Sequence, residues 1–127
     1  MSRLLDVIVS LLGEDAKKDN SQYSFSVMSY IIPRESFFDA ASALKKKYAL
    51  LAAEWATDET PFGRGYGVFA CYRWGAEYLI LKIEVPADDP KFPSLTKVFA
   101  PAYRFERQIK SLMGITPDGH PDSRPWI

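Results

Sequence analysis

His120 is the only histidine of this 127-residue chain and the side chain best suited to acid–base or metal chemistry. Asp118 and Asp122 flank it, in a segment rich in proline and glycine. A catalytic histidine needs a positioned partner, and a metal site needs more ligands than these three residues supply. In such a segment the two aspartates are better suited to fixing turns. We therefore expect His120 to order the C-terminal segment through hydrogen bonds, with no catalytic or metal-binding role.

Charged side chains near the C-terminus suggest a second kind of chemistry. Glu106 precedes Lys110 by four residues, the order that favours an exposed ion pair on a helix. Arg107 and Arg124 carry guanidinium groups, which can bind a carboxylate through two parallel hydrogen bonds. Two interpretations remain open for these residues: a solvated helix surface, or a contact with another protein.

Cysteine count and charge exclude several classes of protein. A single cysteine, Cys71, rules out an internal disulfide and any cluster that needs several thiolates of this chain. It lies in the middle of an apolar segment, where a packed thiol is expected. Lys and Arg number 16, as do Asp and Glu, so no overall field attracts nucleic acid or an anionic membrane. This balance disfavours the alternative of a sheet that stacks RNA bases on Phe69, Tyr72 or Trp74.

Length and composition are those of one globular domain, 1–127, with 47% hydrophobic residues. The apolar segment Leu4–Leu12 is too short to span a bilayer, and Asp6 interrupts it. We expect a cytoplasmic protein, or one that is peripheral on a membrane complex.

The order of elements predicts an α+β fold. Apolar residues at helical spacing alternate with segments in which every second residue is apolar. The sheet is expected to be mainly antiparallel, with about four strands, helices packed on it and an extended C-terminal arm over about 114–127. The predicted elements are a helix at 3–12, a strand at 23–32, a helix at 34–48, strands at 50–56, 66–74 and 77–85, and a helix at 101–113 ended by Gly114.

Three apolar stripes should form the core. They are Phe37, Ala41, Leu44 and Tyr48 on the central helix; Leu79, Leu81, Ile83 and Val85 on the last long strand; and Phe105, Ile109, Leu112 and Met113 on the C-terminal helix.

The C-terminal third resembles one known family, the 30 kDa subunit of respiratory complex I, which includes related domains of membrane-bound energy-converting [NiFe] hydrogenases and formate hydrogenlyase. Its pattern has a Pro-Ser-Leu-Thr segment, a Glu-Arg pair, a Gly-Ile pair and a Gly-His-Pro-Asp-x-Arg run. The first segment matches Pro93 to Thr96. The other matching residues, which we take as the candidate partner-interface motif, are Glu106, Arg107, Gly114, Ile115, Gly119, His120, Pro121, Asp122 and Arg124.

The resemblance implies an accessory role in an oxidoreductase complex, with no catalytic residue, metal or cofactor in this chain. The implied partners are the large subunit, either 49 kDa-like or of the [NiFe] hydrogenase type, and a neighbouring iron–sulfur subunit. It also implies a place on the cytoplasmic side of a membrane complex, without a membrane span of its own. Gln108 and Ser111 stand where the family has acidic residues, and the choice between the two branches stays open.

Overall fold

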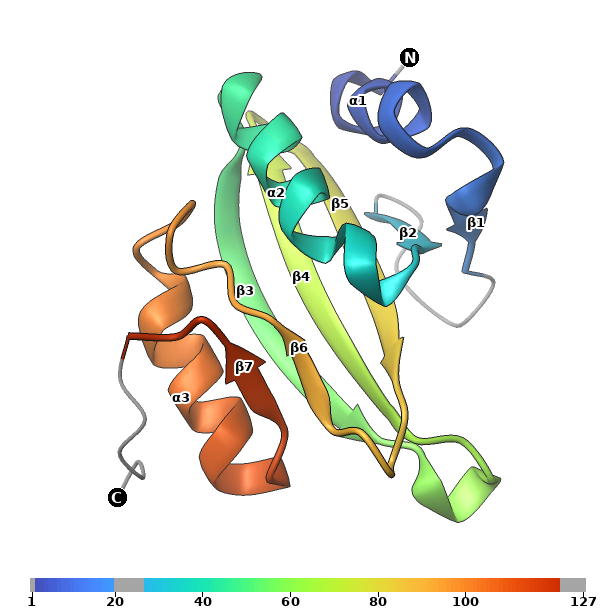
Figure 1. The fold of residues 1–127 in the computed structure, drawn as a ribbon. Helices are drawn as coiled ribbons and strands as arrows, with labels where there is room; N and C mark the ends of the chain where they lie inside the picture. Colours follow the sequence, from blue (N-terminus) through green and yellow to red (C-terminus); the bar gives the residue numbers. More distant parts are fainter. Residues whose placement is uncertain (1, 20–26, 122–127) are drawn as a thin grey trace.

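The computed structural model describes residues 2–19 and 27–121 of the chain. The described residues form three α-helices. They lie beside a curved main sheet (Figure 1). The helices are α1 (Arg3–Leu12), α2 (Phe37–Lys46) and α3 (Ala102–Met113). The strands are β1 (Lys17–Lys18), β2 (Val27–Ile31), β3 (Leu50–Asp58), β4 (Tyr66–Trp74), β5 (Glu77–Val85), β6 (Lys91–Pro93) and β7 (Thr116–Asp118), and short 3-10 turns lie at Gly13–Asp15, Arg34–Ser36 and Thr60–Phe62.

The main sheet has five strands in the order β1-β2-β5-β4-β3. Strands β3, β4 and β5 are antiparallel neighbours, and β2 joins the edge of β5 in parallel. The hairpin of β4 and β5 has the predicted bounds, because Gly75 takes a positive φ of 61° in the turn that reverses the chain. The α+β class is therefore confirmed. The predicted strand at 23–32 is seen as β2 over Val27–Ile31, and its first residues lie outside the described part.

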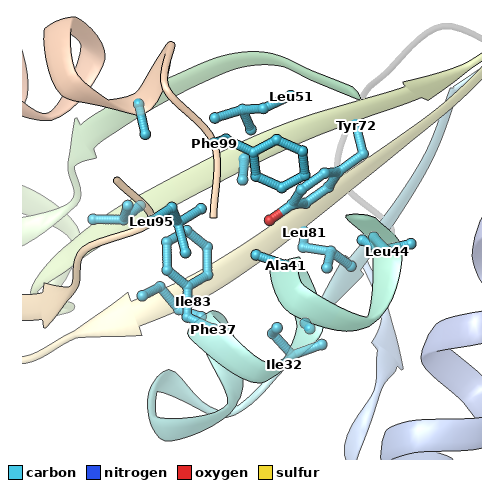
Figure 2. Packing of buried hydrophobic residues seen from close by; sticks show 14 of the residues in the cluster. Ile32, Phe37, Ala41, Leu44, Leu51, Tyr72, Leu81, Ile83, Leu95 and Phe99 are labelled. Carbon is cyan, nitrogen blue, oxygen red and sulfur yellow. The ribbon is translucent and has the colours of Figure 1, made fainter. Parts of the chain in front are cut away.

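The hydrophobic core lies between one face of this sheet and the helices. Figure 1 shows α2 crossing in front of the sheet, with α1, β6 and α3 around it on the same side. The predicted inward stripe of β5 is confirmed, since all four of its residues are buried. Tyr72 of β4 lies beside Phe99, with ring centroids 5.8 Å apart, among side chains from both the sheet and α2 (Figure 2).

The central helix ends earlier than predicted. Phe37, Ala41 and Leu44 are buried as expected. The prediction for Tyr48 is wrong: its side chain is 77% exposed, and its backbone has a φ of 69°. The reason is that α2 ends at Lys46, so Tyr48 lies in the left-handed turn that follows the helix and points outward.

The C-terminal arm is more structured than the sequence suggested. Gly114 ends α3 with a φ of 73°, and the next residue, Ile115, is fully buried. The chain then forms β7, which pairs in parallel with β6 in a second, two-stranded sheet. The arm therefore begins as an extended strand that pairs with its own domain, a pairing that the sequence did not indicate.

Within residues 2–19 and 27–121, no helix is long and apolar enough to cross a membrane.

Candidate functional site

The motif segments predicted from the sequence come together at one end of the molecule. The segment that follows β6 begins with Ser94, and the other two parts are α3 and the chain after Gly114. These parts lie side by side because β7 pairs with β6 while α3 connects the two strands (Figure 1). The Ser94 amide also donates to the Asp118 carbonyl over 2.8 Å, which extends the pairing beyond the strands.

Glu106 holds this arrangement from the inside. It shares the buried face of α3 with Ala102 and Ile109, at helical spacing. Its carboxylate accepts a hydrogen bond from the Ser94 hydroxyl over 2.6 Å and another from the Leu95 amide over 2.8 Å. The side chain is fully buried. The predicted exposed ion pair with Lys110 is therefore wrong: the carboxylate is turned inward and satisfies the turn after β6.

The stripe predicted for α3 needs a second correction. Ile109 is buried, and Phe105 and Met113 are partly buried against the core. Leu112 is 74% exposed, because the buried arc of the helix runs through Ala102, Glu106 and Ile109. The apolar pattern predicted a leucine at the core, whereas the fold buries a glutamate that bonds to the neighbouring turn.

Glu54 of β3 lies against Glu106 and was missed by sequence reasoning. Strict alternation would place it on the face opposite Leu51. A register shift between Leu51 and Ala53 inserts one extra residue, so that Leu51 pairs with Tyr72 and Glu54 with Ala70, and both point into the core. The only signal in the sequence is an acidic residue within a segment that is otherwise apolar.

Burial dominates the electrostatics of both carboxyls. It raises the pKa of Glu54 well above its ordinary value, and the nearby charge of Glu106 and the hydrogen bond between the two groups act in the same direction. Burial also raises the pKa of Glu106, although bonds with Glu54, Ser94 and Leu95 and the proximity of His120 oppose this.

His120 ties the segment after β7 to α3. Its Nε2 lies 2.9 Å from the Tyr103 carbonyl oxygen, and because a carbonyl only accepts, this nitrogen carries the hydrogen. The two rings are also in contact, with centroids 4.8 Å apart. Gly119, with a φ of 88°, makes the turn that brings the imidazole to the helix.

A surface pocket of about 450 Å³ opens beside this contact. Its walls come from the turn after β6, the start of α3 and the chain after β7. They are formed by Thr96, Lys97, Ala100, Tyr103, Gly119 and Pro121, which we call the motif surface. Arg107 lies next to it, with its guanidinium carbon 5.8 Å from the centre of the Tyr103 ring.

The predicted motif residues therefore fall into separate positions. Gly119 and Pro121 belong to the motif surface, His120 and Arg107 border it through their contacts with Tyr103, and Glu106 is buried in the same helix. Gly114 and Ile115 are at the far end of α3, where they direct the chain into β7. Asp122 and Arg124 lie outside the described residues.

The aromatic side chains considered for base stacking are not available as a set. Tyr72 is fully buried, and Phe69 is buried against Trp55, with parallel rings 5.1 Å apart. Trp74 is 41% exposed but carries the Arg3 guanidinium over its ring at 4.5 Å.

Comparison with known proteins identifies relatives. Two proteins of Thermus thermophilus, one from each of two strains and both described as subunits of an NADH-quinone oxidoreductase, are each 36% identical over 50 residues. The matched region covers 39% of this chain and 24% of each relative's length.

Solved structures share the fold. A trypsin-resistant fragment of Nqo5 superposes with a TM-score of 0.78 and 22% identity, over 95% of this chain and 99% of the fragment. A chain of the membrane-bound sulfane sulfur reductase, an archaeal respiratory membrane complex, gives 0.80 with 16% identity, over 98% of this chain and 74% of that one.

The match to a family of proteins is broader. The family described as the 30 kDa subunit of respiratory-chain NADH dehydrogenase matches residues 30–127. This range contains α2, α3 and every motif segment, so the resemblance seen in the sequence is confirmed. The chain belongs to the family of the respiratory-chain NADH dehydrogenase 30 kDa subunit.

Proposed function

We propose that the chain is an accessory subunit of a membrane-associated oxidoreductase complex and docks on its partner through the motif surface. One observation carries this proposal. Motif segments that are distant in the sequence converge on a single pocket, and the side chains that hold them together are on its buried side. Lys97 lines the same pocket and is exposed to solvent.

The proposed partner is the large subunit of the complex, with a neighbouring iron–sulfur subunit beside it. Family membership supports a respiratory complex of the NADH–quinone type. The energy-converting [NiFe] hydrogenase type remains the second branch of this proposal, in which the large subunit holds the nickel–iron site. In either branch the chain is expected to bind no cofactor itself and to lie on the cytoplasmic side of the membrane.

A charge reversal at the motif surface tests the docking proposal. Lys97 lines the pocket and is exposed, so Lys97→Glu should leave the fold intact while placing a negative charge in the interface. We expect the amount of large subunit that co-purifies with a tagged chain to fall at least about tenfold, which corresponds to about 1.4 kcal/mol. Mass spectrometry of the captured proteins would identify the partner and decide the branch.

Lys18→Glu is the matched control, because Lys18 is also an exposed lysine but lies on β1, at the far edge of the sheet. It should capture as much of the large subunit as the unchanged chain does. Arg107→Ala and Arg124→Ala should weaken association while leaving the isolated fold nearly as stable. Equal capture by Lys97→Glu and Lys18→Glu would place the docking surface elsewhere, and unfolding by both arginine variants would make those residues structural.

A further inference from the structure

The carboxyls of Glu54 and Glu106 meet in the interior, where β3 and α3 pack together. Glu54 is 5% exposed, and Glu106 is fully buried. The oxygens of Glu106 accept hydrogen bonds from Ser94 and Leu95, whereas both oxygens of Glu54 are buried with no hydrogen-bond partner among the described residues. The two carboxyls are close enough for Glu106 to raise the pKa of Glu54. They can share a hydrogen bond only when one of them carries a proton, because two ionised carboxylates offer acceptors alone.

The surroundings decide which carboxyl holds that proton. Glu106 is stabilised as an anion by two donors and by the proximity of His120. Tyr72 of β4 has a buried hydroxyl with no hydrogen-bond partner among the described residues. Burial raises the pKa of this hydroxyl, and the nearby charges of Glu54 and Glu106 raise it further. On α2, Lys45 is engaged with the Val98 carbonyl over 2.6 Å. Glu54 is thus the group without stabilising donors, and ionising it would bury a second negative charge.

We propose that Glu54 and Glu106 form an internal proton-binding site, in which Glu54 keeps its proton at neutral pH and donates it to the Glu106 carboxylate. The bound proton fastens α3 to β3. Loss of the proton leaves two like charges facing each other across the junction between α3 and the sheet, and it loosens that junction. This site is independent of the proposed function, because it rests on contacts within the isolated chain.

The proton makes stability depend on pH with a defined sign. In the unfolded chain both glutamates lose their protons near the ordinary carboxyl pKa. In the folded chain burial, the charge of Glu106 and the hydrogen bond with it raise the pKa of Glu54, so the folded chain binds more protons. The free energy of unfolding therefore falls as pH rises from the ordinary carboxyl pKa up to the raised one, and it levels off above that.

Infrared spectroscopy of the full chain detects the proton directly. A protonated carboxylic acid has a carbonyl stretch that is separate from the carboxylate bands. We expect this band at neutral pH, with the intensity of one group per chain, in the unchanged protein. It should vanish in Glu54→Gln, whose amide preserves the hydrogen bond to Glu106 without a titrating proton. The matched control is Glu84→Gln, an exposed glutamate on β5, which should keep the band.

Urea unfolding between about pH 5 and about pH 9 provides the second readout. The midpoint should fall with rising pH in the unchanged chain and in Glu84→Gln, and it should fall less in Glu54→Gln. Glu54→Gln can be replaced if it fails to fold. The substitute experiment labels the glutamate carboxyls of the unchanged chain and of Glu84→Gln and follows their protonation by NMR. Absence of a protonated carboxyl at neutral pH, or an equal pH slope in Glu54→Gln, would overturn the proposal.

Discussion

At the scale of single residues, Glu77 shows how one carboxylate fixes an element distant in sequence. It lies at the start of β5, and its oxygens receive hydrogen bonds from the Ser2 hydroxyl and the Leu4 amide, the latter over 2.9 Å. The Ser2 oxygen in turn caps the Leu5 amide over 2.9 Å. A carboxylate at a helix N-terminus also interacts favourably with the helix dipole. Glu77 therefore attaches α1 to the sheet.

Glu77→Gln should destabilise the chain by about 1 kcal/mol, because a neutral amide accepts these bonds more weakly. Partial burial acts to raise the pKa of Glu77, but the bonds from Ser2, Leu4 and Arg3 outweigh it and lower the pKa. This contribution is present above the ordinary carboxyl pKa and is lost as pH falls through the lowered one. Urea unfolding at neutral and acid pH checks it, with Glu84→Gln as the control. An unchanged midpoint at neutral pH would contradict the assigned role.

The two carboxyl sites thus respond to pH in opposite directions. Glu77 loses its contribution in acid, whereas the Glu54 proton is lost as pH rises. The sequence alone could not separate them, because both residues sit in segments of alternating or apolar character. Their roles depend on what is packed against each strand: a helix N-terminus for Glu77 and another carboxyl for Glu54.

At the scale of elements, sequence reasoning worked where one local pattern decides the outcome. Strands β4 and β5 were predicted with their observed bounds, because alternation and a glycine turn fix a hairpin locally. The reasoning failed where contacts with a segment distant in the sequence determine the local structure. A single-residue bulge in β3 places Glu54 on the core face of the sheet. The pairing of β7 with β6 makes the polar segment after α3 part of the fold. Neither event leaves a local pattern to detect.

Ile115 and Leu112 make a matched pair for testing the C-terminal elements. Ile115 is fully buried where the chain leaves α3, and Leu112 is mostly exposed one turn earlier. Ile115→Ala should cost about 2–4 kcal/mol through lost burial and a residual cavity. Leu112→Ala should stay within about 0.5 kcal/mol. Thermal or urea unfolding measures both variants. Similar losses in the two would mean that the arm after α3 is not anchored as described.

At the scale of the whole molecule, charge balance limits the kinds of partner. Lys and Arg equal Asp and Glu in number, so association with a polyanion lacks the counterion-driven affinity that nucleic-acid binders use. Tyr72 and Phe69 are buried, which removes two aromatic rings from any stacking surface.

Titration of the chain with a single-stranded RNA at low salt should therefore show no binding in the micromolar range. Fluorescence anisotropy of a labelled RNA measures this directly, and a basic RNA-binding protein is the positive control. A rise in anisotropy that salt suppresses would restore the RNA-binding alternative.

The edges of the main sheet affect how readily copies of the chain can aggregate. An open edge strand is a template on which other chains can add strands and aggregate. Here one edge is β1, only two residues long and formed by two exposed lysines, and α3 packs at the other edge against β3. An edge as short and charged as β1 discourages the addition of a foreign strand. The β1 edge is therefore a poor template for aggregation between copies of the free chain.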